Sequence, residues 1–105
     1  MLIYNFNNKF QNINEIYEFS DKIDNSKYIC IKNIDNENGM EINSDEDKQK
    51  LKDFFNKIRV RESKLKLIDK EQKIDYTIYI YTSDAQIFVN INDSEIMINN
   101  EIYET

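Results

Sequence analysis

The chain has 105 residues and a net charge of −6, and it contains one cysteine, one glycine, no proline and no histidine. A chain of this length supports one modest core, so residues 1 to 105 are expected to fold as a single domain. The lack of histidine excludes Ser-His and Cys-His nucleophiles and all metal sites that use imidazole, and a lone cysteine excludes an intrachain disulfide. No cofactor is expected.

The sequence carries no signal for a membrane. No run approaches the length of a transmembrane helix, and the N-terminus lacks a basic region followed by an apolar stretch. A cytoplasmic protein without a membrane partner is therefore predicted. The heavy use of Ile, Asn and Lys is typical of a low-GC genome. Cys30 lies within an apolar stretch, where a buried and inert thiol is expected.

The N-terminal part predicts one strand and one short helix. Residues 2 to 6 alternate loosely between apolar and polar side chains and predict the strand. Asn12 followed by Glu15 is typical of a helix start, and a helix over residues 13 to 24 is expected. The apolar side chains near one face of this helix are Ile13, Ile16, Tyr17 and Ile23.

A hairpin is predicted next. Residues 28 to 34 and residues 40 to 43 are expected to be its strands, and residues 35 to 39 its turn. Gly39 follows an Asn in this polar cluster, which indicates a backbone position with positive φ. A calcium-binding loop is the alternative, but an EF-hand would need an oxygen ligand five residues before its glycine, where Ile34 stands.

Ser44 is expected to begin an amphipathic helix. Its hydroxyl can cap the first turn, and negative charges follow where the helix dipole favours them, at Asp45, Glu46 and Asp47. Apolar side chains then recur at helical spacing, at Leu51, Phe54, Phe55 and Ile58. The basic residues expected to match the dipole at the other end are Lys57, Arg59 and Arg61. This stripe is expected to pack on the apolar face of a sheet.

The C-terminal part predicts that sheet. Residues 64 to 68 alternate Lys with Leu and predict an edge strand. Residues 73 to 99 predict three antiparallel strands, because apolar residues recur at every second position between two short polar breaks. The breaks set the register. The expected pairs are Ile80 with Ile87, Ile78 with Val89, Tyr76 with Ile91, Ile91 with Ile96, and Val89 with Ile98.

The element order predicts an α+β fold, a single small domain in which one or two helices pack on an antiparallel sheet with a C-terminal three-stranded meander. Five short segments carry a family resemblance: Ile29-Cys30-Ile31-Lys32, Asn38-Gly39-Met40-Glu41-Ile42, Ser44-Asp45, Ile78-Tyr79-Ile80-Tyr81 and Ile102-Tyr103-Glu104. Through them, residues 28 to 104 resemble a family of small uncharacterised Firmicutes domains usually found on lipoproteins. That family has no established activity, so the resemblance implies a fold and no chemistry.

Charge is distributed unevenly along the chain. Residues 57 to 73 carry 7 basic and 3 acidic side chains, whereas residues 74 to 105 carry no basic and 6 acidic side chains. The acidic meander disfavours nucleic acid and suits a basic partner. The basic segment is the alternative, a nucleic-acid site for which the candidate residues are Arg59, Arg61, Lys64 and Lys66. Because acids interrupt this segment and no aromatic residue does, a solvated surface is the favoured interpretation.

The second face of the meander carries the candidate site. The predicted register places Tyr79 opposite Phe88, with Tyr81 beside them, and Asn90 opposite Met97. One interpretation is a second small core, covered by Leu2, Tyr4, Phe6 and the helix with Ile13, Ile16 and Tyr17. The other is an exposed surface for a partner or a second copy of the chain, made of Tyr79, Tyr81, Phe88 and Met97.

These features predict a non-enzymatic, acidic protein-binding module, such as an inhibitor or immunity-type protein of a low-GC bacterium or its phage. Its partner is expected to be a protein with a basic surface, or a second copy in a homodimer. A nucleic-acid-binding accessory protein that uses residues 57 to 73 is the alternative. Catalysis ranks third, because paired carboxylates are the main chemistry left to a chain without histidine.

Overall fold

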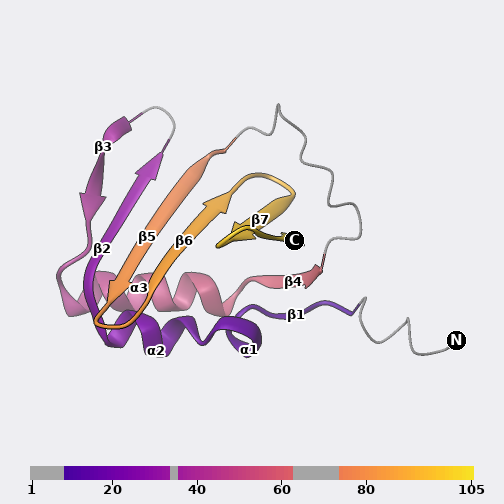
Figure 1. Ribbon diagram of the computed structural model, residues 1–105, viewed down its shortest axis with the longest axis horizontal. Coiled ribbons are helices and arrows are strands. Elements are labelled where there is room, and N and C mark those ends of the chain that lie inside the picture. The colour runs from indigo at the N-terminus through magenta and orange to yellow at the C-terminus, as the bar shows by residue number, and fades with distance from the viewer. Residues whose placement is uncertain (1–8, 34–35, 63–73) are drawn as a thin grey trace, which may run out of the picture.

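The computed structural model describes residues 9 to 33, 36 to 62 and 74 to 105 (Figure 1). Their strands form one antiparallel sheet of eight, in the order β1-β4-β8-β7-β6-β5-β2-β3. The strands are β1 (Gln11–Asn12), β2 (Ser26–Asn33), β3 (Asn36–Glu41), β4 (Arg59–Glu62), β5 (Tyr76–Thr82), β6 (Gln86–Ile91), β7 (Glu95–Ile98) and β8 (Glu101–Glu104). The helices on one side of it are α1 (Asn14–Tyr17), α2 (Phe19–Asp24) and α3 (Asp45–Asn56). The predicted α+β class is confirmed.

The meander has the predicted register and one strand more than predicted. All five expected pairs are present, among them Ile78 opposite Val89 and Ile91 opposite Ile96. β8 then pairs antiparallel with β7. Asn99 and Asn100, between these strands, both have positive φ, at 46° and 79°. A two-residue turn of this kind matches the twist of a hairpin, so the Asn-Asn pair was the missed signal for a fourth strand.

The β2–β3 hairpin is confirmed, but Gly39 does not lie in its turn. β3 already begins at Asn36, and Gly39 lies within that strand with a φ of +71°. The pairing with β2 is irregular there, with a register shift between Ile31 and Asn33. Positive φ was expected correctly, and its cause is a bulged strand. A Cβ on Gly39 would lie 2.8 Å from the Cys30 sulfur, which also favours glycine.

The predicted N-terminal helix is two short helices. Glu18 separates α1 from α2 with a left-handed φ of 44°. Asn12 accepts a hydrogen bond from the Asn14 amide at 2.9 Å, as a capping side chain would, although Asn12 itself belongs to β1. The break directs Phe19 into the core, where it is fully buried. Sequence reasoning missed Phe19.

α3 begins as predicted and ends earlier than its expected basic end. The Ser44 hydroxyl accepts a hydrogen bond from the Asp47 amide at 3.1 Å. The helix stops at Asn56, and its last turn holds no basic residue. Arg59 and Arg61 instead flank Val60 in β4, and Val60 is fully buried. Alternation of charged and apolar residues here is the pattern of a strand, which explains the error.

One core lies between the helices and the sheet. Phe19 and Phe55 stack at its centre, with ring centroids 4.1 Å apart and planes 3° apart. Leu51 and Phe55 of α3 share this core with sheet residues, including Ile78, Ile80 and Val89. The predicted packing of α3 on that row is therefore confirmed. Phe54 departs from it, because 41% of its surface stays exposed.

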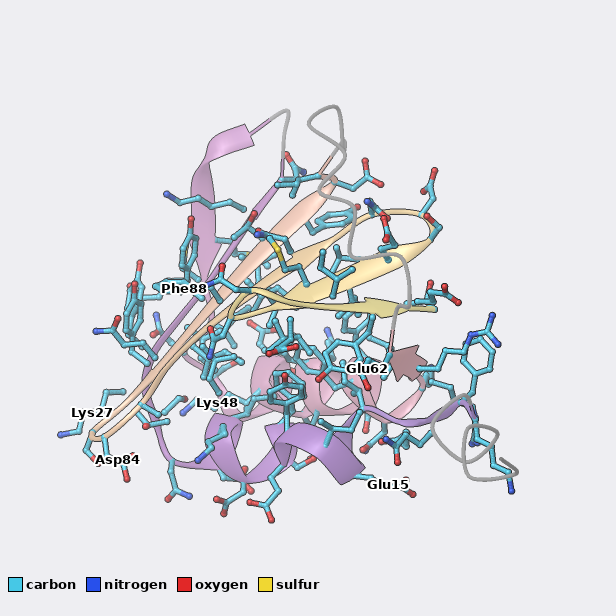
Figure 2. All side chains as sticks on the ribbon, turned by 45° about the vertical axis from the view of Figure 1, so that its right-hand side comes forward. Glu15, Lys27, Lys48, Glu62, Asp84 and Phe88 are labelled. Atoms are coloured by element: carbon cyan, nitrogen blue, oxygen red, sulfur yellow. The ribbon has the colours of Figure 1, made fainter. Side chains whose placement is uncertain are left out.

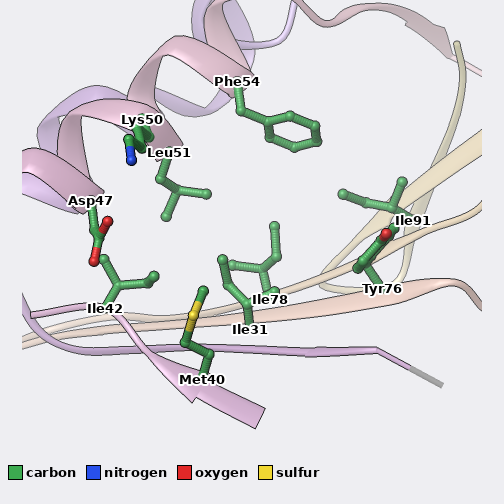
Figure 3. Close-up of a pocket in the computed structure, with 10 residues that line it drawn as sticks. All are labelled: Ile31, Met40, Ile42, Asp47, Lys50, Leu51, Phe54, Tyr76, Ile78 and Ile91. Atoms are coloured by element: carbon green, nitrogen blue, oxygen red, sulfur yellow. The ribbon is translucent and has the colours of Figure 1, made fainter. Parts of the chain in front are cut away.

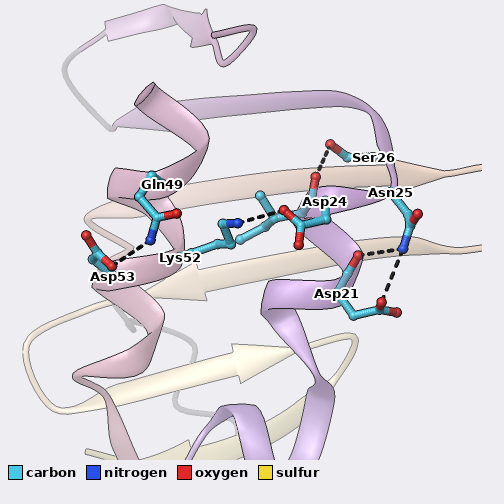
Figure 4. Close-up of polar contacts among 8 residues, drawn as sticks. Asp21, Asp24, Asn25, Ser26, Gln49, Lys52 and Asp53 are labelled. Carbon is cyan, nitrogen blue, oxygen red and sulfur yellow. Dashed lines mark hydrogen bonds and ion pairs between the residues drawn. The ribbon is translucent and has the colours of Figure 1, made fainter. Parts of the chain in front are cut away.

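Polar contacts join α2 to α3 at the edge of this core (Figure 4). Lys52 of α3 donates to Asp24 of α2 at 2.7 Å. The Ser26 hydroxyl, at the start of β2, donates to the Ile23 carbonyl at 2.7 Å and so ties the end of α2 to the sheet. α2 is thereby held on the same side of the sheet as α3.

Two predicted strands, residues 2 to 6 and 64 to 68, lie outside the described residues. Within the described ranges, no helix is long and apolar enough to cross a membrane. The strand that follows α3 is β4, which pairs with β1 on one side and β8 on the other.

Candidate functional site

The sheet has one face that the helices cover and one that they do not. Because side chains alternate along a strand, the residues that pair with buried isoleucines point toward the helices, and their neighbours point away. We call the second surface the open face. Its residues on the central strands are Tyr28, Cys30 and Lys32 of β2, Thr77, Tyr79 and Tyr81 of β5, Gln86, Phe88 and Asn90 of β6, and Met97 of β7. Figure 2 shows Phe88 on the side of the sheet away from the helices.

Four aromatic rings form a patch at the centre of the open face. We call Tyr28, Tyr79, Tyr81 and Phe88 the aromatic patch. Phe88 meets the Tyr79 ring edge-on at 5.4 Å and the Tyr81 ring at 6.1 Å, and Tyr28 contacts Tyr81 at 5.8 Å. Edge-to-face geometry is the preferred arrangement of aromatic pairs. Tyr28 and Phe88 still expose 42% and 38% of their surface.

The floor beside the patch is closed. Cys30 lies opposite Tyr79 and exposes only 6% of its surface, which confirms that its thiol is buried. A hydrogen bond with Cys30 raises the pKa of the Tyr28 phenol above its ordinary value of 10. Gly39 leaves room for the sulfur by lacking a side chain. The rings therefore stand on a packed base.

Amide side chains border the patch on the β6–β7 side. A hollow of about 320 Å³ there is lined by Phe88, Met97 and four amides, namely Gln86, Asn90, Asn99 and Asn100. Two of the amides are held in place, because Thr77 donates to Asn90 at 2.9 Å and Asn99 accepts from the Phe88 amide at 2.9 Å. The register thus places Met97 beside Asn90 and next to the aromatic patch, as predicted.

Lys32 and Arg61 also reach the open face, which the sequence did not reveal. The Lys32 amine lies 5.5 Å from the centroid of the Tyr79 ring. Arg61 lies opposite Glu104 and pairs with it at 2.7 Å. The run from 74 to 105 has no positive charge of its own, but its acids are partly balanced in space by these residues. Both cations come from strands outside that run.

The helix that was expected to cover the patch does not do so. Ile13 is fully buried in the core on the helix side, and Ile16 and Tyr17 pack against that core. The Tyr17 and Tyr103 hydroxyls are 2.9 Å apart, and Tyr103 lies opposite the buried Ile96. This part of the second-core interpretation is therefore wrong. Leu2, Tyr4 and Phe6, the other expected cover, lie outside the described residues.

Both described residues of the alternative nucleic-acid site make contacts within the chain. Arg59 donates to the Phe10 carbonyl at 3.1 Å. Arg61 lies 4.8 Å from the centroid of the Phe10 ring, besides its pair with Glu104. Lys64 and Lys66 fall outside the described residues. Within the described part of the chain, the basic side chains of this candidate site are thus occupied by contacts to other residues of the protein.

Sequence reasoning missed Tyr28 as a member of the patch. Its position depends on the pairing of β2 with β5, in which Tyr28 lies opposite Tyr81. These strands are separated by β3, α3 and β4 along the chain, so no local pattern reveals their contact. The described part of the chain holds no group of three or more acidic or cysteine side chains that could bind a metal ion.

Comparison of the chain with protein families, with curated proteins and with solved structures found no match. The resemblance to small Firmicutes domains stays a prediction. The function is therefore inferred from the two surfaces of the sheet and from the charge of the chain.

Proposed function

We propose that the protein is a non-enzymatic protein-binding module that binds its partner through Tyr79, Tyr81, Phe88 and Met97. The observation that carries this proposal is the partial exposure of the aromatic patch on a sheet face that the described helices leave open. Large aromatic side chains supply most of the energy in many interfaces, and Met adapts to irregular partner surfaces.

The patch is suited to binding because its rings are already ordered. Phe88 is held by two ring contacts and by a strand in the middle of the sheet. When a partner covers these rings, they would therefore lose little side-chain entropy. The amides that border Phe88 supply the polar rim that interfaces usually have.

Charge favours a basic protein as the partner. The chain has a net charge of −6, which would speed encounter with a basic surface. An inhibitor or immunity-type protein of a low-GC bacterium or its phage fits this combination of small size, acidity and lack of histidine. A second copy of the chain is the other candidate occupant of the patch.

Two substitutions test the proposal, with one matched control. Tyr81→Ala and Phe88→Ala remove rings from the patch, while Phe10→Ala removes a ring that is 39% exposed at the far edge of the sheet. Each variant is immobilised, and proteins retained from a lysate of the source organism are quantified by mass spectrometry. We expect the two patch variants to retain at least about tenfold less of a partner protein than the wild type and Phe10→Ala retain.

Sedimentation velocity of the same variants tests the homodimer. A wild-type dimer that Phe88→Ala converts to a monomer would assign the patch to self-association. Equal retention by all variants, together with a monomeric wild type, would contradict the proposal.

Nucleic-acid binding through residues 57 to 73 is the second candidate, because 7 of those residues are basic and 3 are acidic. A gel shift of labelled duplex DNA at low salt tests it. A shift that disappears as salt rises would support it, and no shift at low salt would eliminate it.

A further inference from the structure

An apolar groove lies on the helix side of the sheet, opposite to the open face. It runs between α3 and the ends of β2, β3, β5 and β6, and its volume is about 290 Å³ (Figure 3). Its floor includes Ile42, Leu51 and Ile78, which are all more than nine-tenths buried. The groove exists because α3 leaves this end of the sheet uncovered.

The walls of the groove are large apolar side chains that solvent reaches. Met40 exposes 58% of its surface, Tyr76 49% and Phe54 41%. Figure 3 shows Leu51 directed from α3 toward the sheet, and the Phe54 ring extending over the groove toward the side of Ile91. Exposed apolar side chains that gather around a hollow mark a binding site more often than scattered ones do. This explains why Phe54 departs from the expected burial.

The size of the groove fits two large side chains. A cavity of about 150 Å³ holds one benzene ring, so 290 Å³ accommodates about two apolar groups of that size. The lining positions on α3 extend from Asp47 to Phe54, which is about 10 Å along the helix axis. Two side chains at positions i and i+4 of a helix are about 6 Å apart and would both reach the floor.

The charge beside the groove is negative. Asp47 and Lys50 are the charged residues among those that line it. Lys50 forms an exposed i,i+4 pair with Glu46 at 3.8 Å, so Glu46, Asp47 and Lys50 together leave one net negative charge beside the groove. Asp45 lies in the same first turn of α3, and the chain as a whole carries −6. An occupant with positive charge beside its apolar groups is therefore favoured.

From this geometry we propose that the groove binds a basic amphipathic helix of a partner protein, which inserts two large apolar side chains between α3 and the sheet. Helices bind apolar grooves in this manner through anchors at i, i+3, i+4 and i+7. The site is separate from the aromatic patch, which lies on the opposite face. The chain would thus offer two partners one surface each.

A model peptide tests this inference directly. The probe is a fluorescein-labelled 18-residue peptide of Leu and Lys, with leucines at the helical spacing above. Anisotropy measures its binding, and circular dichroism measures the helix that it gains. Phe54→Lys and Met40→Lys each replace an apolar side chain of the groove wall with a positive charge, which repels the lysines of the peptide. Each is expected to weaken binding at least about tenfold. Asp47→Asn removes one charge and is expected to weaken it about threefold.

Controls separate the groove from non-specific attraction and from the aromatic patch. A shuffled peptide of the same composition and a Leu/Glu peptide with the same spacing should both bind at least about tenfold more weakly. Phe88→Ala should bind the probe like the wild type. Conversely, Phe54→Lys should keep the partner that the patch retains, so that failure of one proposal leaves the other standing.

Several results would overturn the inference. Equal binding of the shuffled peptide, or unchanged binding by Phe54→Lys, would show that charge alone attracts the probe. A wild-type dimer that Phe54→Lys dissociates would assign the groove to a second copy of the chain. A fall in melting temperature for Phe54→Lys as large as that for Phe55→Ala would show that the chain itself closes the groove.

Discussion

Two neighbouring phenylalanines of α3 differ sharply at the level of the single residue. Phe55 is fully buried and stacks on Phe19, whereas Phe54 exposes 41% of its surface over the groove. Phe55→Ala should lower the free energy of unfolding by about 3 to 5 kcal/mol, and Phe54→Ala by about 1 kcal/mol. Urea denaturation of both variants measures the difference. Equal losses would contradict the assignment of Phe54 to the groove wall.

Gly39 has a backbone conformation that restricts substitution. Its φ of +71° disfavours any side chain, and a Cβ would lie 2.8 Å from the Cys30 sulfur. Gly39→Ala should therefore cost about 2 kcal/mol in the free energy of unfolding. In a Cys30→Ala background the part of that loss caused by the thiol should disappear, while the backbone part and the contact with Lys32 Cγ at 2.9 Å remain. An equal loss in both backgrounds would show that the thiol is not the obstacle.

Tyr17 gives the protein a response to alkaline pH. Burial, and then its hydrogen bond with Tyr103, raises the pKa of Tyr17 above its ordinary value of 10. The unfolded chain releases this proton first, so the contribution is fully present below about pH 10 and is lost as pH rises beyond it. We expect the free energy of unfolding to fall above that pH in the wild type and to fall less steeply in Tyr17→Phe. Equal slopes would contradict the role of Tyr17.

At the level of the element, α3 depends on its N-terminal cap. The Ser44 hydroxyl accepts a hydrogen bond from the Asp47 amide at 3.1 Å, and three acidic residues follow in the first turn. Ser44→Ala should cost about 1 kcal/mol in the free energy of unfolding. Ser83→Ala, in an exposed turn, is the control and should cost less than about 0.5 kcal/mol. Similar losses for both would mean that the cap contributes nothing specific.

The elements that could be predicted from sequence are those whose signals are local. The meander strands alternate at every second residue, and short turns connect them, so both the strands and their register could be predicted. β4 was missed because its basic residues also suit a helix end. β8 was missed because its four residues follow an Asn-Asn turn that was not recognised. The break at Glu18 has no local signal in the sequence.

For the whole molecule, the sequence indicated the aromatic patch on the open face of the sheet but could not indicate the groove beside α3. The pairs Tyr79–Phe88 and Asn90–Met97 lie within one meander, so the core of the patch was predictable. Tyr28 joins it only through the pairing of β2 with β5, and Lys32 arrives on the same strand. The groove depends on where α3 ends over the sheet, which is a property of packing and not of pattern.

The central claim is that the aromatic patch is an outer surface of the folded chain and is therefore available to a partner. The free energy of unfolding of Phe88→Ala, measured beside Phe55→Ala, tests this most directly. Phe88 is 38% exposed and loses two ring contacts on truncation, so the account predicts a cost of about 1 to 1.5 kcal/mol, well below that of Phe55→Ala. A cost of about 3 kcal/mol or more, equal to that of a core phenylalanine, would mean that the patch is buried and would contradict the claim.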